Sequence, residues 1–455
     1  MPDRPRIWID AIGVLSWEKP RVTGIQRVEA TLLSEALSGR HPDVGIAVYS
    51  RLSNEWMPLS AASVRYLKSF IDLKLTGSDD TLPDVPWRVT LAQLAHSPSS
   101  KPRYELAARI AGRSSGLVYQ ITKGALRTGL SIAKPLARAT ATFARWTGTS
   151  RCLLEGASNT VLLSYCGPIS VEQSKVLARR KARLCHIFYD LIPIDYAHWY
   201  GAILEDGFEH YVRTIVAQHE RIFAISEFSC DRLRDWAREQ GLRSPDVVAV
   251  PLGDIMAMPD SADPQPVEML EGKRFAVFCS TIEPRKNHLT LVRAWEKLAR
   301  ERGLEGLPHL VFVGHYGWLY EEAKQAIEES PAAARIHLLA NLPDEQLAWA
   351  YRNAMIGLFP SVVEGWGLGV SESLVNGLPV LISDAASLNE AAQGLMPVIP
   401  ACDVDGWAEE IARLLDDPDA LSDLGTRVAD YRPRPGNEYA GEILAGIRSL
   451  QSGPR

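Results

Sequence analysis

Residues 359–384 read FPSVVEGWGLGVSESLVNGLPVLISD, and this stretch decides the fold class. Its first apolar run ends at Pro360 and leads into a loop rich in glycine. Apolar residues then recur at helical spacing from about Leu368 to Asn376, and a second apolar run covers Pro379–Ile382. A strand, loop, helix and strand in this order are the repeating unit of an α/β fold with a parallel sheet.

The same alternation extends along the chain in both directions. Strands are predicted near residues 7–9, 161–164, 185–190, 221–225, 246–250, 275–279, 310–313, 336–339, 356–359 and 379–382. Helical stretches such as 289–298 and 344–352 lie between them. Residues 254–272 are rich in proline and aspartate and are predicted to be a linker. We therefore predict two Rossmann-like, doubly wound domains, 1–253 and 273–430, that face each other across a cleft, and an amphipathic helix within 431–455.

Composition restricts the class of protein further. The 455 residues are 46% apolar and 23% charged, which is ordinary for a globular protein of two or three domains. A net charge of −6 argues against a nucleic-acid partner. The six cysteines are far apart and form no C-x-x-C pair, which favours reduced thiols over disulfides or a zinc site. No secretory signal and no run of 18 apolar residues occur, so we expect a cytoplasmic protein without a membrane span.

Residues 101–151 differ from the rest of the chain. They carry ten basic residues and one acid, a charge of +9, so the remainder carries −15. On a helical projection the basic side chains gather on one side and apolar ones broadly opposite. This pattern predicts a basic amphipathic helical insertion that binds an anionic membrane surface. The alternative is a basic-faced helical insertion that packs on its own domain.

Two glutamates in the opening stretch are candidate ligand-binding residues. Glu364 is predicted in the loop and Glu372 about one turn into the helix. A helix N-terminus attracts phosphate, and a carboxylate nearby can accept hydrogen bonds from a ribose diol. The alternative is a solvated helix face. A dinucleotide-binding fingerprint is a further alternative, but its spacing fails because its third glycine would fall at Val370.

A second candidate element is CSTIEPRKNH, residues 279–288, which follows the first strand of the second domain. Its Arg285 and Lys286 are predicted at the start of a helix, where cations oppose the helix dipole. Their position is therefore unfavourable unless they bind a ligand, and a pyrophosphate is a ligand that two cations suit. The alternative is a solvated pair.

These motifs together resemble the retaining GT-B glycosyltransferases of family 4. EGWGLGVSE (364–372) is similar to the E-x7-E motif of that family. STIEPRKNH (280–288), ISEFS (225–229), PSVVEGWGL (360–368) and SLNE (387–390) occur in the family's order. The resemblance covers about 160–395, and 1–40 loosely. It implies a GT-B fold, a nucleotide-sugar donor on the C-terminal domain, an acceptor on the N-terminal one, retention of anomeric configuration, and no metal or other cofactor. It also implies that the terminal helix crosses back to the first domain.

The resemblance also assigns roles to single residues. Glu372 would hold the donor ribose, Glu364 would orient the transferred sugar, and Lys286, assisted by Arg285, would bind the diphosphate. Backbone N–H groups of Gly365, Trp366, Gly367 and Leu368 would contact sugar and phosphate. The first-domain loop would close on the donor through Gly13 and Gly24.

The sequence departs from the family at three positions. Thr281 stands where the family often has an arginine, and Gly369 where a proline is common. Tyr189–Asp190 replaces the usual His–Asp at the end of a first-domain strand, so Tyr189 and Asp190 are candidate sugar or acceptor contacts. His186 is nearby but is predicted to face the core or to lie behind the contacting residues.

The resemblance to O-antigen mannosyl- and rhamnosyltransferases makes GDP-mannose the favoured donor. With the basic insertion, it implies transfer of a hexose to a lipid-linked saccharide acceptor in bacterial surface polysaccharide or glycolipid synthesis. The enzyme would then lie peripherally on the inner face of the plasma membrane. Two alternatives stay open: a soluble transferase similar to sucrose- or trehalose-phosphate synthases, and a catalytically silent transferase-like scaffold.

Overall fold

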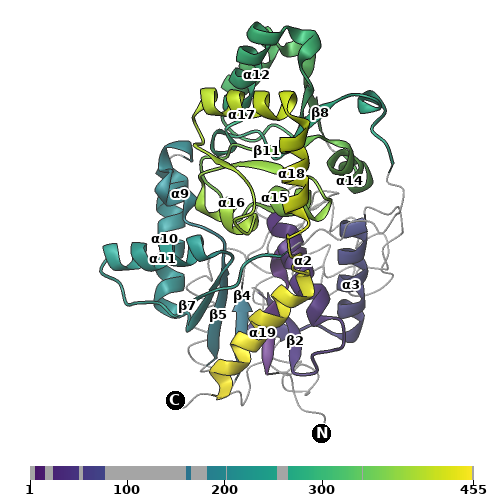
Figure 1. The fold of residues 1–455 in the computed structure, drawn as a ribbon. Helices are drawn as coiled ribbons and strands as arrows, with labels where there is room; N and C mark the ends of the chain where they lie inside the picture. Colours follow the sequence, from purple (N-terminus) through teal and green to yellow (C-terminus); the bar gives the residue numbers. More distant parts are fainter. Residues whose placement is uncertain are drawn as a thin grey trace, which may run out of the picture. The chain divides into compact units, whose positions relative to one another are not determined.

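A computed structural model describes residues 6–15, 24–50, 55–76, 160–164, 182–200, 202–253, 265–340 and 342–452 (Figure 1). The predicted insertion 101–151 and most of the predicted linker lie outside these residues. The chain forms two compact units. The first contains residues 1–187, 213–222 and 440–455, and the second contains 188–212 and 223–439.

A seven-stranded sheet forms from the first half of the chain. Its strands follow the order β3-β2-β1-β4-β5-β6-β7. The pairs β1–β2, β1–β4 and β4–β5 are parallel, and the edge pair β2–β3 is antiparallel. The strands are β1 (Ile7–Asp10), β2 (Val44–Ser50), β3 (Glu55–Pro58), β4 (Val161–Ser164), β5 (Arg183–Phe188), β6 (Arg221–Ala224) and β7 (Val247–Ala249).

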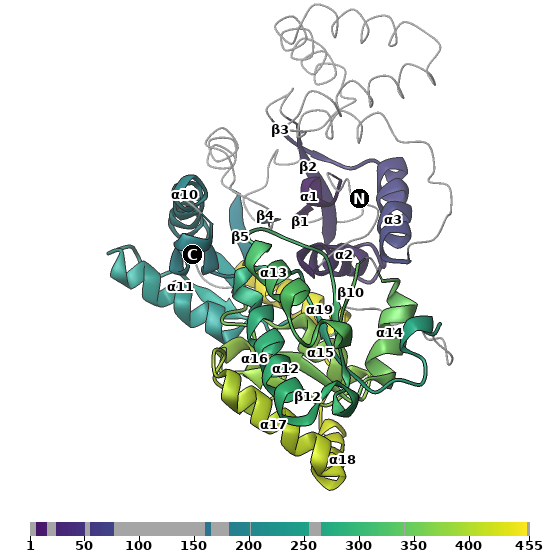
Figure 2. The same cartoon turned by 90° about the horizontal axis from the view of Figure 1, so that it is seen from above.

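Helices α1 (Ile12–Leu15), α2 (Gly24–Ala36) and α3 (Ala61–Thr76) belong to the first unit. Apolar side chains of α2, among them Val28, Leu32 and Leu33, are fully buried. Helices α2 and α3 pack against each other beside the sheet (Figures 1 and 2). The buried residues of β1 and α2 recur with the strand and helix periods that the sequence shows.

Further helices follow β5 and β6: α9 (Ile192–Asp195), the 3₁₀ turn η1 (Ala197–Trp199), α10 (Ala202–Gln218) and α11 (Glu227–Glu239). Ser226 caps the N-terminus of α11, because its hydroxyl accepts a 2.9 Å hydrogen bond from the Ser229 N–H. His186 is fully buried and hydrogen-bonds the Ser164 hydroxyl at 2.8 Å, so its predicted place in the core is confirmed.

The second unit contains a six-stranded parallel sheet of order β10-β9-β8-β11-β12-β13. Its strands are β8 (Phe275–Cys279), β9 (His309–Val313), β10 (Ile336–Leu339), β11 (Ile356–Phe359), β12 (Val380–Ser383) and β13 (Val398–Ile399). Its α-helices are α12 (His288–Arg302), α13 (Glu321–Glu329), α14 (Asp344–Asn353), α15 (Leu368–Val375), α16 (Ala386–Ala391), α17 (Val404–Asp416) and α18 (Pro418–Val428). Short 3₁₀ turns are η2 (Glu268–Leu270), η3 (Pro284–Lys286), η4 (Leu304–Gly306) and η5 (Ala333–Arg335).

The described end of the predicted linker is packed rather than free. Val267 and Leu270 are buried in one apolar cluster with Phe275 and Tyr351 of the second sheet and α14. Burial of this kind stabilises the second unit, so the segment from about Val267 onward is part of that unit.

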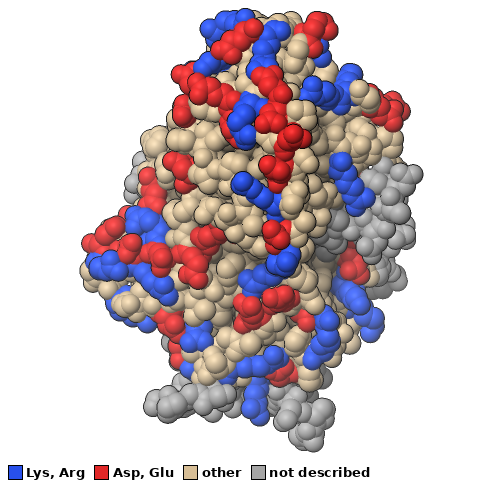
Figure 3. Space-filling model, in the orientation of Figure 1, with Lys and Arg blue, Asp and Glu red and all other residues tan. Residues whose placement is uncertain are grey.

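Charges of both signs cover the face of the second unit that includes α12 and α17 (Figure 3). The two helices pack together. Lys297 pairs with Asp405 at 2.6 Å, and Arg302 pairs with Asp416 at 2.5 Å. Among the described residues, no helix is both long and apolar enough to span a bilayer.

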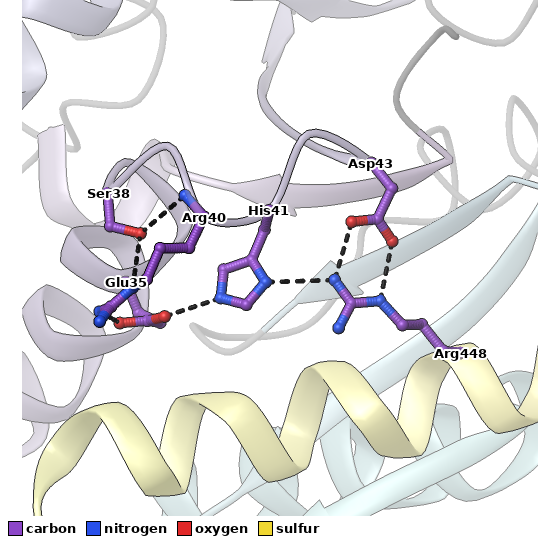
Figure 4. Close-up of polar contacts among 6 residues, drawn as sticks. All are labelled: Glu35, Ser38, Arg40, His41, Asp43 and Arg448. Carbon is purple, nitrogen blue, oxygen red and sulfur yellow. Dashed lines mark hydrogen bonds and ion pairs between the residues drawn. The ribbon is translucent and has the colours of Figure 1, made fainter.

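The terminal helix α19 (Gly436–Ser452) places most of its length in the first unit. Arg448 donates to both carboxylate oxygens of Asp43, at 2.7 and 2.8 Å, and to the His41 ring at 3.2 Å (Figure 4). His41 also bonds Glu35, which in turn pairs with Arg40. We call these five residues the Asp43 network. It fixes α19 to the loop that precedes β2.

Candidate active site

The loop between β11 and α15 carries a buried carboxylate. It starts at Pro360 and leads through Ser361 and Glu364 to Gly367, the residue before α15. Ser361 is fully buried and Glu364 is only 7% exposed. A carboxylate is rarely buried this deeply without partners, because it loses its hydration. The contacts of Glu364 therefore decide what the loop can do.

Glu364 lies between two cations from the loop after β8. Arg285 donates to its Oε2 at 2.5 Å, and the Lys286 ammonium donates to its Oε1. The Ser361 hydroxyl donates to the same Oε1 at 2.9 Å. The Val362 N–H bonds the Arg285 carbonyl at 2.8 Å, so the backbones of the two loops are joined as well. The sequence prediction that Glu364 shares a site with Arg285 and Lys286 is consistent with this geometry.

The predicted helix start at Arg285 and Lys286 needs a correction. Both residues lie in the 3₁₀ turn η3, and α12 begins only at His288. Asn287 separates the two elements in a left-handed conformation, with φ of 58°. Its side-chain amide donates to the carbonyls of Pro360 and Ala401, which ties three loops together. An asparagine tolerates this conformation better than most residues.

Electrostatics keep Glu364 ionised. Burial by itself would raise the pKa of Glu364, but Arg285 and Lys286 outweigh it and lower that pKa to about 2. Burial lowers the pKa of Lys286, and the charge of Glu364 opposes that change. Burial also disfavours the charged Arg285, yet its carboxylate neighbours raise its pKa above the ordinary value. The arrangement is a preorganised group of fixed charges.

Two further acids surround Arg285. Glu283, 3% exposed, forms an ion pair with the Arg285 Nε at 2.6 Å. Asp190 interacts electrostatically with Arg285 and accepts a 3.0 Å hydrogen bond from the Ile192 N–H. Burial raises the pKa of both carboxyls, and Arg285 opposes the rise. We call Glu364, Arg285, Lys286, Glu283 and Asp190 the Glu364 cluster.

Sequence reasoning predicted Asp190 as a candidate but missed Glu283 and Tyr200. Burial raises the pKa of Tyr200 to about 12, and its hydroxyl interacts electrostatically with Arg285, Asp190, Glu283 and Glu364. The signal for Glu283 was its place in E-P-R-K, two residues before Arg285. For Tyr200 the sequence offered no comparable signal.

Two glycines of the loop are required by close packing. A Cβ on Gly365 would lie 2.9 Å from Asp190 Oδ2, so only glycine lets the loop approach Asp190. Gly367 has a φ of 133°, and a Cβ there would lie 2.6 Å from Leu388. The Ser387 hydroxyl donates to the Glu364 carbonyl at 2.7 Å, which fixes the loop from α16. These contacts present the Gly365–Leu368 backbone ahead of α15.

Tyr189 lies beside this loop, and Trp366 is part of it. The Tyr189 carbonyl accepts a 2.8 Å hydrogen bond from the Ser229 hydroxyl, and the same hydroxyl lies 3.4 Å from the Gly365 carbonyl. The Trp366 side chain is 8% exposed. Glu390 of α16 accepts hydrogen bonds at 2.8 Å from the N–H groups of Glu227 and Phe228 at the start of α11. The ISEFS and SLNE motifs therefore meet, a contact that sequence reasoning did not predict.

The other predicted residues have different surroundings. Glu372 lies in α15, half-buried, and accepts a 3.1 Å hydrogen bond from the Tyr351 hydroxyl. Gly13 lies in α1 and Gly24 begins α2, both in the first unit. Their roles toward a donor remain predictions. In the described part of the chain, no three His, Cys, Asp or Glu side chains gather in a way that could hold a metal ion.

Two sheets of largely parallel strands, each flanked by helices, are the architecture of the GT-B class of α/β proteins. Residues 260–430 match the family described as glycosyl transferases group 1. The matched segment covers less than half of the chain, and it carries Glu364, Arg285, Lys286 and Glu283.

Several curated relatives are named mannosyltransferases. The chain is 32% identical over 152 residues to O-antigen chain mannosyltransferase B of Escherichia coli, covering 33% of this chain and 39% of the relative. It is 27% identical over 250 residues to serotype-specific mannosyltransferase WbdA of the same species, covering 51% and 30%. A third relative is MMP alpha-(1->4)-mannosyltransferase of Mycolicibacterium hassiacum, 29% identical, with 50% and 51% covered. The matches thus span about half or less of each relative's length.

Solved structures show the same fold. Sucrose-phosphate synthase from Thermosynechococcus elongatus has a TM-score of 0.58 at 14% identity and covers 98% of this chain and 99% of its own. A UDP-forming trehalose-phosphate synthase from Burkholderia xenovorans has a TM-score of 0.52 at 16% identity, covering 70% and 80%. At these identities the likeness supports the fold class and no particular substrate.

Proposed function

We propose that this chain is a retaining glycosyltransferase that transfers a hexose, with mannose favoured, from a nucleotide-sugar to a saccharide acceptor in surface polysaccharide or glycolipid synthesis. The observation that carries the proposal is the ionised Glu364, held by Arg285 and Lys286 in the loop before α15. The family match supports the reaction class, and relatives named mannosyltransferases support mannose and, with it, GDP-mannose as donor.

Lys286 and Arg285 are the residues that would bind the donor diphosphate. Both cations pair with Glu364 in this structure, and Arg285 also pairs with Glu283. A diphosphate offers more negative charge than one carboxylate. Binding would therefore draw the cations, Lys286 above all, away from Glu364. Glu364 would then accept hydrogen bonds from the hydroxyls of the transferred sugar, with the Gly365–Leu368 N–H groups on sugar and phosphate. Glu372 would hold the ribose.

In the proposed reaction, the bond between the sugar C1 and the diphosphate oxygen breaks. The oxygen of an acceptor hydroxyl bonds to C1 on the same face, and its proton passes to the leaving diphosphate. Lys286 stabilises the charge that develops on the leaving group, which lowers the barrier because this interaction strengthens in the transition state. We infer that no metal is required, since Lys286 and Arg285 can supply the positive charge.

We further propose a lipid-linked acceptor and a peripheral position on the inner face of the plasma membrane. The support is the +9 charge and amphipathic pattern of residues 101–151. The full chain should sediment with vesicles that contain anionic phosphatidylglycerol and not with neutral vesicles, and a variant without residues 101–151 should stay in the supernatant. If that variant still sediments, the membrane role fails and the soluble sucrose- or trehalose-phosphate-synthase-like alternative gains weight.

The direct test is product formation. The full chain is incubated with GDP-mannose, UDP-glucose or dTDP-rhamnose and an α-linked mannotriose acceptor that carries an alkyl chain. Mass spectrometry should detect one added hexose with GDP-mannose, and NMR of the new anomeric centre should show an α linkage. EDTA should leave the rate unchanged.

Lys286→Ala should abolish the product, while Lys297→Ala, which removes an ammonium from the surface of the same unit, should not. Nucleotide binding without turnover on any pair of donor and acceptor would support the silent scaffold instead.

A further inference from the structure

An exposed tryptophan lies beside the Glu364 cluster. Trp318 is 39% exposed and Leu319 is 55% exposed, both in the loop that joins β9 to α13. The ring of Trp318 contacts the ring of Tyr200, with centroids 5.3 Å apart and planes at 46°. We call Tyr200, Trp318 and Leu319 the aromatic patch. Exposed apolar side chains that gather in this way commonly mark a binding surface.

The backbone holds this loop in one place. The Ile282 N–H donates to the His315 carbonyl, and the Gly317 N–H donates to the Ile282 carbonyl, both at 2.9 Å. Ile282 directly precedes Glu283 of the Glu364 cluster, so the loop is fixed to the segment that bears the cations. Leu319 has a φ of 51°, a left-handed conformation that is unfavourable for a leucine. The structure therefore maintains a strained residue next to Trp318 while leaving both side chains in contact with water.

Tyr200 joins the aromatic patch to the charged site. One side of its ring contacts Trp318, and its hydroxyl interacts electrostatically with Arg285, Asp190 and Glu364. A ligand on Trp318 would thus lie against Tyr200, which interacts with Glu364, the residue proposed to hold the transferred sugar. Glu372, proposed to hold the ribose, instead bonds Tyr351 of α14. A Cβ on Gly317, the residue before Trp318, would lie 3.5 Å from Glu283 Oε2, so the aromatic patch lies beside the Glu364 cluster.

We propose that the aromatic patch binds a sugar ring of the saccharide acceptor. A pyranose presents C–H groups on its faces and hydroxyls around its edge. The C–H faces match the rings of Trp318 and Tyr200, and the hydroxyls match the carboxylates beside Tyr200. This inference rests on the proposed function and assigns it an acceptor subsite.

The test is calorimetric binding of α-linked mannotriose to the full chain in the presence of GDP. Trp318→Ala should weaken binding by about tenfold or more, as expected for loss of a central aromatic contact, and Trp318→Phe should weaken it less. Met269→Ala serves as the matched control, because Met269 is also 39% exposed in the same unit and lies in η2. It should bind mannotriose as the wild type does.

Other outcomes overturn the inference. Equal affinity of Trp318→Ala and the wild type would show that the aromatic patch does not contact the saccharide, as would absence of mannotriose binding by the wild type. Weaker GDP binding by Trp318→Ala, with mannotriose binding unchanged, would assign the ring to the nucleobase. GDP binding measured separately on the wild type and on Lys286→Ala tests the proposed function, so failure of the acceptor subsite and failure of the donor site are distinguishable.

Discussion

The Glu364 cluster and the Asp43 network use the same kinds of side chain in two different environments. The Glu364 side chain is 9% exposed, and its two cations lower its pKa to about 2. Arg448 and Asp43 are 38% and 34% exposed, and the pKa of Asp43 is lowered chiefly by hydrogen bonds from Arg448. Water screens the second group and hardly reaches the first. Burial therefore separates charges arranged for a ligand from charges that fasten a helix.

The largest effect is expected at Glu364. Glu364→Gln preserves shape and removes the charge that orients the sugar, so kcat should fall by about a hundredfold or more. GDP binding should persist, because Lys286 and Arg285 remain. Steady-state kinetics measure kcat, and calorimetry measures GDP binding. Glu409→Gln, which changes an exposed side chain of α17, serves as control. A Glu364→Gln enzyme within about threefold of the wild type would remove Glu364 from the catalytic role.

Lys286→Ala should abolish the stabilisation that a nucleotide diphosphate provides. A ligand at about a hundred times its Kd stabilises the folded state by ~2.7 kcal/mol, and this appears as a rise in Tm. The wild type and Lys297→Ala should show the rise with GDP, while Lys286→Ala should not. If Lys286→Ala keeps the full rise in Tm with GDP, Lys286 does not bind the diphosphate. The proposal that a diphosphate draws Lys286 away from Glu364 then fails.

Acid should reduce the contribution of Glu364 to stability. Its pKa is about 2 in the folded chain against an ordinary 4.5, so its contribution is fully present above about pH 4.5 and is lost as pH falls toward 2. Urea unfolding of the wild type and Glu364→Gln should differ most near neutral pH and converge below pH 4.5. The pKa of Asp43 is also lowered, so Asp43 makes stability pH-dependent as well. This contribution is the same in both proteins and cancels in their difference. A difference that stays constant down to pH 3 would contradict the low pKa.

The smallest effect belongs to the Asp43 network. Arg448→Ala should lower the free energy of unfolding by about 0.5–1 kcal/mol, because exposed pairs contribute little even when bidentate. Arg40→Ala, which removes a 59% exposed side chain, should cost less. Both variants should retain transferase activity. If Arg448→Ala lowers the free energy of unfolding as much as Glu364→Gln does, exposure does not distinguish the Asp43 network from the Glu364 cluster.

Most strands and helices within residues 273–430 were predicted, because the apolar runs there are short and separated by glycine and proline. Predicted strand 310–313 is β9 (His309–Val313), and predicted helix 368–376 is α15 (Leu368–Val375). Strands β2 and β3 were missed. A Cβ on Gly45 would lie 2.5 Å from the Trp8 ring, and β3 is a four-residue edge strand that ends in Pro58. Neither strand has the uninterrupted apolar pattern of a central parallel strand.

In the site, residue types were predictable and mutual contacts were not. The sequence indicated that Glu364, Arg285 and Lys286 belong together, because each suits one part of a nucleotide-sugar. It did not indicate that both cations pair with Glu364, since that contact joins residues 78 and 79 positions apart. Glu283 and Tyr200 were missed because burial beside Arg285 depends on how loops meet, which no local period encodes.

The chain passes between the two compact units four times, at 187/188, 212/213, 222/223 and 439/440. The family match at 260–430 is therefore shorter than the unit around it. A truncated protein that contains only residues 260–430 would lack Asp190 and Tyr200. It would keep Glu364, Arg285 and Trp318. A fragment for crystallisation or for a nucleotide sensor should begin no later than Phe188. The segment 188–212 of the second unit supplies Asp190 and Tyr200, which interact with Arg285.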